Sequence, residues 1–167
     1  MEQSLKEKLI RLFFIAGSII VSDQITKYMI LSAMPLHSSI PVIPGFFSLT
    51  HIHNPGGAFG MFADGSPLLR KILFLALSSL AICFVLYFYH STPINYRALS
   101  SGFAMIFGGA IGNMIDRIRF EKVVDFLDFY INTAHWPAFN VADSAITIGV
   151  TIFIIHLVFD KMPPMQN

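Results

Sequence analysis

The segment 107-FGGAIGNMIDR-117 combines small and polar residues at helical spacing inside an otherwise apolar stretch. On a helix, one side of this segment would carry Gly109, Gly112, Asn113 and Asp116. Small residues allow helices to approach closely within a membrane, so this side would face a helix bundle. Helix packing alone explains the two glycines. Asn113 and Asp116 fit either structural support or contact with a substrate, and the pattern leaves both interpretations open.

The composition around this segment is that of a membrane protein with several spans. The chain has 167 residues, of which 54% are hydrophobic, 13% are charged and 17 are phenylalanine. A soluble domain is far less apolar. A helix needs about 20 residues to cross the hydrocarbon core of a bilayer. Four stretches reach this length, approximately residues 9–30, 68–89, 98–118 and 140–159. We therefore predict an all-α membrane protein, a single domain of residues 1–167 built on a bundle of four transmembrane helices.

The first stretch could instead be a cleaved signal peptide, because Lys6, Lys8 and Arg11 precede its apolar run. However, "SDQITK" (22–27) follows the apolar run at the place where a small-residue cleavage site would stand, and three further spans come later. We interpret the stretch as an uncleaved first helix.

With four spans, both termini lie on one side of the membrane, and residues 31–67 and 119–139 lie on the other. Positive charge favours a cytoplasmic position for the termini, so the two long segments would be extracytoplasmic. Residues 40–62 are rich in proline, glycine and β-forming residues and show no helical period. We expect a small β-rich platform there, resting on the membrane surface, and a second extracytoplasmic loop at residues 119–139.

Two carboxylates near the last span, Asp125 and Asp143, are candidates for acid–base chemistry. They lie eighteen positions apart, and the loop between them could fold back and bring them together. Two carboxylates in one site cannot both ionise easily, so the pair would hold a proton near neutral pH and could act as acid and base. Alternatively, each could pair with Arg117, with Arg119 or with a helix N-terminus. Asp128 could also be the second member of the pair, although its flanks suggest an interfacial position.

Two further motifs contain polar residues with a possible function. In the first span, Asp23 and Lys27 have the i, i+4 spacing and the order that favour an ion pair, and structural pairing is the role we expect. Asn54 precedes a turn in which Gly56 and Gly57 permit unusual backbone angles. Its amide could face a substrate backbone or simply close the turn.

Several other classes of protein are disfavoured by what the sequence lacks. The basic residues are scattered and do not suggest a nucleic-acid-binding surface. One cysteine allows no disulfide within the chain. The six histidines include no HExxH pair, and His51 and His53 have no third ligand nearby, which argues against a zinc peptidase. No G-x-S-x-G segment or recognisable Ser/Lys pair is present.

Acidic residues in membrane helices also occur in proton pathways, so a small proton-coupled transporter or channel is the main alternative. Transporters commonly contain internal repeats, and this sequence shows none. A purely structural membrane assembly factor is the third interpretation. In that case, neutral replacements of Asp125 and Asp143 should leave function intact.

Five blocks of the sequence resemble, in order and spacing, the motifs of the bacterial lipoprotein signal peptidases, also called type II signal peptidases. The blocks are SDQITK (22–27), HNPGGAFGMF (53–62), GGAIGNMIDR (108–117), VVDFLDF (123–129) and FNVADSAITIG (139–149). Together they extend over almost the whole chain. Any one block alone would be a weak match, whereas five blocks in register are highly specific.

The resemblance implies an aspartic endopeptidase of the bacterial cytoplasmic (inner) membrane, with four transmembrane helices and an active site near the outer, periplasmic face. Such enzymes remove the signal peptide of a prolipoprotein immediately before a cysteine that carries a diacylglyceryl group. No metal or other cofactor is implied. The expected partners are this precursor and membrane lipids, and we expect a monomer that binds no nucleic acid.

Residue by residue, the resemblance places the catalytic pair on Asp125 and Asp143 and gives Asp128 no such role. The residues expected to bind substrate or support the site are Asn54, Gly56, Asn113, Arg117 and Asn140. The residues expected to have structural roles are Asp23, Lys27, Gly109, Gly112 and Asp116.

Overall fold

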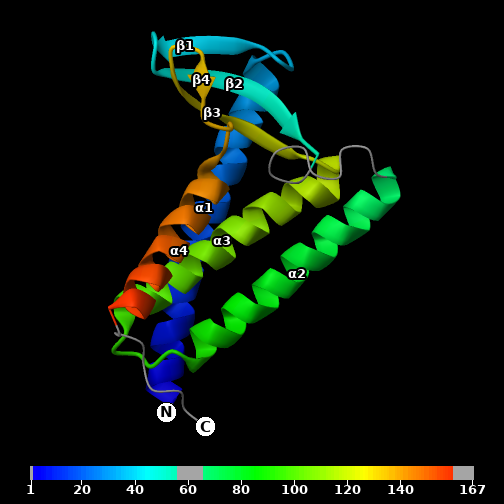
Figure 1. Ribbon diagram of the computed structural model, residues 1–167. Helices are drawn as coiled ribbons and strands as arrows, with labels where there is room; N and C mark the ends of the chain where they lie inside the picture. Colours follow the sequence, from blue (N-terminus) through cyan, green and yellow to red (C-terminus); the bar gives the residue numbers. More distant parts are fainter. Residues whose placement is uncertain (1, 56–65, 160–167) are drawn as a thin grey trace.

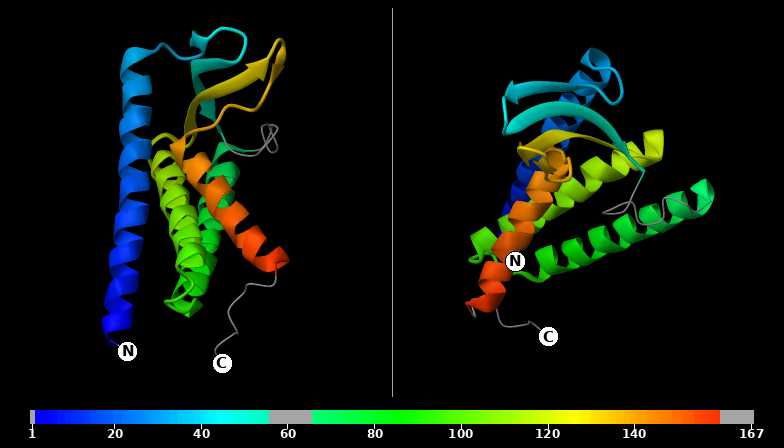
Figure 2. Two further views of the ribbon diagram at one scale, coloured as in Figure 1. Left: turned by 90° about the vertical axis from the view of Figure 1, so that its left-hand side faces the viewer. Right: turned by 45° about the horizontal axis from the view of Figure 1, so that its top comes forward.

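Four long helices and a small sheet make up the chain, as the computed structural model in Figure 1 shows. The structure describes residues 2–55 and 66–159. The elements in chain order are α1 (Glu2–Ala33), β1 (Ser39–Ile43), β2 (Phe47–Asn54), α2 (Pro67–Ser91), α3 (Arg97–Phe120), β3 (Val123–Ile131), β4 (Ala134–His135) and α4 (Val141–Val158). The sheet lies at one end of the helices, away from the start of α1 and the end of α4 (Figures 1 and 2).

All four predicted spans are present as helices. Each helix is long and apolar enough to cross a membrane, and the spans are Leu5–Ala33, Lys71–Ser91, Arg97–Phe120 and Val141–Val158. The helix ends lie close to the predicted ones, except that α1 begins at Glu2 rather than near residue 9. Large apolar side chains such as Phe13, Leu68 and Val158 are exposed along α1, α2 and α4. Such exposure is typical of helices that face lipid.

Helix α3 is the centre of the bundle because it contacts α1, α2 and α4. Its glycines make these contacts close. A Cβ atom at Gly108 would lie 2.9 Å from Ala16 Cα of α1, and one at Gly109 would collide with the carbonyl oxygen of Ala142 of α4. Helix α2 packs mainly against α3, and near its end Tyr89 Oη also donates to the carbonyl oxygen of Lys8 of α1 at 2.6 Å. The small-residue patch predicted from the sequence therefore packs against two helices.

The sheet has the strand order β1-β2-β3-β4, and neighbouring strands are antiparallel. It differs from the prediction in one respect, because residues 119–139 contribute β3 and β4 to the same sheet rather than forming a separate loop. The sequence of β3, VVDFLDFYI, is rich in β-branched and aromatic residues. Its partner β2 lies far away in the sequence, so the local pattern could not show the pairing.

The junction between α3 and the sheet fixes the position of β3. Directly after α3, Glu121 adopts a left-handed backbone conformation with φ of 60°, and the chain turns into β3. Val124 and Phe126 of β3 are buried in a cluster with side chains from the end of α1. Asp125, which stands between them, is therefore held at the end of the bundle.

Candidate active site

Asp125 lies in β3 beside β2, and only 2% of the residue is exposed. Its carboxylate oxygens accept two amide hydrogen bonds. Asn140 Nδ2 donates to Oδ1 at 2.7 Å, and Asn54 Nδ2 donates to Oδ2 at 3.1 Å. Burial, together with the nearby charge of Asp143, raises the pKa of Asp125 to about 7, although both amides and Lys27 act in the opposite direction. Asp125 can therefore bind or release a proton near neutral pH.

Asp143 lies in the first turn of α4 and forms a capping box with Asn140, the residue before the helix. The N–H of Asp143 donates to Asn140 Oδ1 at 2.9 Å, and the N–H of Asn140 donates to Asp143 Oδ2 at 3.3 Å. The other oxygen of the carboxylate accepts from Asn113 Nδ2 of α3 at 2.7 Å. The sequence analysis gave pairing with a helix N-terminus as an alternative to a catalytic role, and Asp143 makes such a contact at the start of α4.

Asn140 connects the two carboxylates and is completely buried. Its side-chain oxygen accepts the backbone N–H of Asp143, so its NH2 group faces the other way, toward Asp125. The same NH2 group lies 3.2 Å from Asn113 Oδ1 and 3.3 Å from the carbonyl oxygen of Val124. A single amide side chain therefore brings the two candidate catalytic residues into one hydrogen-bonded unit.

A buried lysine stands behind this unit. The Nζ atom of Lys27 lies 2.8 Å from Asp23 Oδ2 and 2.9 Å from Asp116 Oδ2. It also donates to Asn113 Oδ1 at 3.0 Å. Lys27, Asp23 and Asp116 are each no more than 2% exposed. The ion pair expected between Asp23 and Lys27 is thus present, and Asp116 completes a buried triad in which every charge has an opposite partner.

The two carboxylates of the triad also fix the backbone beside the candidate pair. Asp23 Oδ1 accepts the N–H of Ala142 at 2.9 Å, and Asp116 Oδ2 accepts the N–H of Val124 at 3.1 Å. Each of these donors immediately precedes one member of the pair, Asp143 or Asp125. Helices α1 and α3 therefore set the backbone position of both members.

Gln24 was not among the residues proposed from the sequence. Its Nε2 atom lies 3.0 Å from Asp116 Oδ1 and 3.2 Å from both Asp23 Oδ2 and the carbonyl oxygen of Gly112. Gln24 therefore joins α1 to α3 in the layer behind the pair. Its position directly beside Asp23 in an apolar span was the signal that could have identified it.

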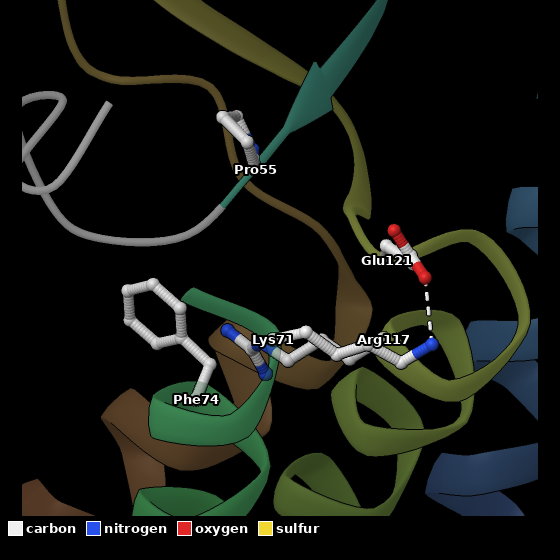
Figure 3. Close-up of a pocket in the computed structure, with 5 residues that line it drawn as sticks. All are labelled: Pro55, Lys71, Phe74, Arg117 and Glu121. Atoms are coloured by element: carbon white, nitrogen blue, oxygen red, sulfur yellow. Dashed lines mark hydrogen bonds and ion pairs between the residues drawn. The ribbon is translucent and has the colours of Figure 1, made fainter. Parts of the chain in front are cut away.

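Arg117 and Lys71 link α3 to the start of α2 (Figure 3). The side chain of Lys71 extends from α2 to Glu121, with 2.6 Å between Nζ and Oε1. The side chain of Arg117 extends the other way, and its Cζ atom lies 5.6 Å from the centre of the Phe74 ring. Pro55, which follows Asn54, lines the same small pocket. The positive charge of Arg117 also interacts favourably with the negative charges of both carboxylates in the candidate pair.

Asp128, which was also considered from the sequence, is absent from this cluster. Asp128 lies farther along β3, where its carboxylate contacts His135 Nδ1 of β4 at 2.9 Å on the exposed part of the sheet. Gly56 lies outside the described residues. Within residues 2–55 and 66–159, no group of three or more His, Cys, Asp or Glu side chains is arranged to hold a metal ion.

Comparison with known proteins shows which family this sequence matches. A family model described as "Signal peptidase (SPase) II" matches residues 15–159. The lipoprotein signal peptidase of Desulforapulum autotrophicum is 56% identical over 157 residues, which cover 94% of this chain and 97% of that protein. The lipoprotein signal peptidase of Syntrophus aciditrophicus is 41% identical over 154 residues, which cover 92% of this chain and 96% of that protein.

A solved structure shares the fold. It is described as a bacterial membrane enzyme, determined by the in meso method at 2.3 Å resolution, and it is 33% identical to this chain. The two structures superimpose with a TM-score of 0.80, and the match covers 90% of this chain and 88% of the other.

Proposed function

The chain belongs to the family of type II signal peptidases, which are aspartic peptidases, and we propose that it removes the signal peptide from diacylglyceryl-modified prolipoproteins. In this proposal, the scissile bond immediately precedes the lipidated cysteine, and Asp125 and Asp143 are the catalytic pair. The shared name of the relatives, lipoprotein signal peptidase, supports the substrate class.

The observation that carries the assignment of the pair is the unit formed by Asp125, Asn140 and Asp143. One amide side chain contacts both residues, and each carboxylate also accepts a hydrogen bond from a second asparagine. The raised pKa of Asp125, about 7, is the property needed for one carboxyl group to be protonated while the other is ionised. At neutral pH the unit can therefore supply one acid and one base.

The proposed reaction needs only these two groups and a water molecule. The ionised carboxylate takes a proton from water, whose oxygen attacks the carbonyl carbon before the cysteine. The protonated carboxyl group gives its proton to the carbonyl oxygen, and a tetrahedral diol forms. A proton then passes to the amide nitrogen, the C–N bond breaks, and the products are the signal peptide with a free carboxylate and a cysteine with a free amine. The order of protonation belongs to the pair as a unit.

The location of the pair suits a substrate that is anchored in the bilayer. The chain is a membrane protein with four apolar helices, and the pair lies where the sheet meets the C-terminal end of α3 and the start of α4. A precursor held by its acyl chains could enter sideways with its scissile bond at this level. We place the protein in the bacterial inner membrane, with cytoplasmic termini and the site near the periplasmic face.

We also propose that a monomer is active. Both carboxylates and the amide side chains of Asn54, Asn113 and Asn140 that contact the pair come from a single copy of the chain. No residue of a second copy is required to complete the unit.

Cleavage of a purified, diacylglyceryl-modified prolipoprotein tests this proposal. The assay compares wild type with Asp125→Asn, Asp143→Asn and Asp128→Asn in detergent, with a chelator present throughout and product detected by gel shift. We expect cleavage by wild type and Asp128→Asn only. Cleavage at the wild-type rate by Asp125→Asn or Asp143→Asn would reject the assigned pair, and no cleavage by wild type would reject the function.

A further inference from the structure

Two histidines of β2, next to the candidate active site, have no role in the mechanism above. His51 is buried, His53 is half-buried, and their Nε2 atoms lie 3.1 Å apart. His51 Nδ1 lies 2.8 Å from the carbonyl oxygen of Met34, which directly follows α1. The two rings therefore connect the end of α1 to the residue before Asn54, whose amide donates to Asp125.

These contacts determine which nitrogen atoms carry a hydrogen. A carbonyl oxygen only accepts, so His51 Nδ1 carries a hydrogen, and in a neutral ring His51 Nε2 is then an acceptor. His53 Nε2 must therefore be the donor, which leaves His53 Nδ1 without a hydrogen. This Nδ1 atom is buried, and no partner for it lies within hydrogen-bond distance among the described residues. Among the neutral forms of the two rings, only this arrangement satisfies both contacts.

We propose that His51 and His53 form a neutral positioning pair that holds Asn54 against Asp125. The strand register supports this role, because His53 lies opposite Val124, the residue before Asp125, across the β2–β3 ladder. A displaced His53 would therefore shift the adjacent Asn54 relative to the carboxylate. The proposal rests on the proposed function only in that Asp125 is taken as a catalytic residue.

Protonation of the pair disrupts this arrangement. An added hydrogen would lie either on the buried Nδ1 of His53, which has no acceptor, or between two Nε2 atoms that would both carry hydrogen. Burial, followed by the charges of Lys122, His51 and His37, lowers the pKa of His53 below its ordinary value, and Asp116 opposes this change. Because the unfolded chain binds this proton more readily than the folded chain, neutral His53 contributes stability at neutral pH that is lost as the pH falls below about 6.5.

Three variants test the role of the pair in cleavage of the lipidated precursor from about pH 5 to about pH 9. Leucine at position 53 removes the donor, glutamine supplies an N–H near the position of Nε2, and His135→Leu on the exposed β4 is a matched control. We expect His53→Leu to lower kcat by about 10- to 100-fold with little change in KM, as for other displaced catalytic groups. His53→Gln should recover most of the activity and move the acid limb of the pH profile to lower pH, while His135→Leu should match wild type.

The titration of Asp125 is a second readout that does not depend on cleavage. Infrared difference spectra of the carboxyl C=O stretch report it, with Asp125→Asn used to assign the band. The Asn54 contact lowers the pKa of Asp125, so its loss in His53→Leu should raise that pKa above about 7. Wild-type kcat in His53→Leu, or an unchanged titration of Asp125, would overturn the proposal.

Two further outcomes distinguish failure of the positioning role of the histidines from failure of the proposed function. If His53→Leu does not fold, the acid limb of His53→Gln decides, and a limb identical to that of wild type would overturn the positioning role. If wild type fails to cleave the precursor, the proposed function fails, whereas the titration of Asp125 still decides whether His53 positions Asn54.

Discussion

At the scale of single residues, Asn140 performs two tasks with one side chain. Its oxygen caps α4, and its nitrogen donates to the Asp125 carboxylate. Asparagine is the good N-cap residue that carries an acceptor and a donor on two separate atoms, since the single hydroxyl oxygen of serine or threonine must serve as both and ionised aspartate has no donor. The identity of this residue therefore follows from the need to combine a helix cap with a carboxylate partner.

Replacing Asn140 by aspartate should separate these two tasks. Aspartate keeps an oxygen that can cap α4, but its carboxylate would be buried against three acceptors, Asp125 Oδ1, Asn113 Oδ1 and the carbonyl oxygen of Val124, so the free energy of unfolding should fall. The new carboxylate would face Asp125 and raise its pKa further, so cleavage should fall at least tenfold. Thermal unfolding and the cleavage assay check the two effects, and full activity in Asn140→Asp would contradict the role given to its NH2 group.

Replacing Asp125 by asparagine should abolish cleavage and stabilise the fold at high pH. The pKa of Asp125 is about 7 in the folded chain, against about 3.9 in an unfolded chain. The stability that comes from the protonated form is complete below the unfolded value and is lost as the pH rises toward the folded one. The gain in Tm of Asp125→Asn over wild type should therefore be larger at about pH 8 than at about pH 5. Asp128→Asn is the control, and an equal gain there would refute the explanation.

The sequence was sufficient to propose the two carboxylates but not their partners. Asp125 and Asp143 could be selected because ionisable residues beside an apolar span are costly and therefore informative. The roles of Gln24, His51 and His53 depend on atoms of other elements, such as the carbonyl oxygens that follow α1 or lie within α3. No spacing within their own segments indicates those contacts.

At the scale of elements, the contact between α3 and α4 sets the position of Asp143. The start of α4 lies directly against a glycine of α3, and the same region of α4 donates a backbone N–H to Asp23 of α1. The glycine patch could be predicted from its helical spacing. The pairing of β3 with β2 could not, because the whole of α2 and α3 separates the two strands in the sequence.

A methyl group at Gly109 should disturb this contact. Its Cβ atom would collide with the carbonyl oxygen of Ala142 and lie 2.7 Å from Ile146 Cγ1. Such overpacking costs about 1–3 kcal/mol, so Gly109→Ala should lower both Tm and kcat. Gly17→Ala in α1 is the matched control, because nothing lies within 4 Å of its added methyl group. An equal loss in both variants would mean that the effect comes from the helix backbone rather than from α4.

At the scale of the whole molecule, the triad of Lys27, Asp23 and Asp116 joins the parts of the chain. It links α1 to α3 by ion pairs, to α4 through Ala142 and to the sheet through Val124. The four spans could be predicted because apolar length is a local property of the sequence. The convergence of α1, α3, α4 and β3 on one triad is a property of the assembled fold.

Removing the lysine should therefore destabilise the entire chain. Lys27→Met leaves two buried carboxylates without a cation, which should cost about 3–5 kcal/mol in the free energy of unfolding. The triple variant Asp23→Asn, Lys27→Met, Asp116→Asn should regain much of that loss, since no uncompensated charge remains. Lys71→Met is the control, because its pair with Glu121 is exposed and such pairs contribute about 0–1 kcal/mol. Equal Tm values for the two lysine variants would contradict this account.

The cap of α4 also bears on how the molecule is made. Asp143 reaches this position only when the first turn of α4 has formed on Asn140 and the N–H of Ala142 donates to Asp23 of α1. The ribosome produces α4 after the other three helices. A nascent chain whose α4 is still missing therefore has no assembled pair of Asp125 and Asp143, and under the proposed mechanism it cannot cleave a precursor until its last helix is inserted.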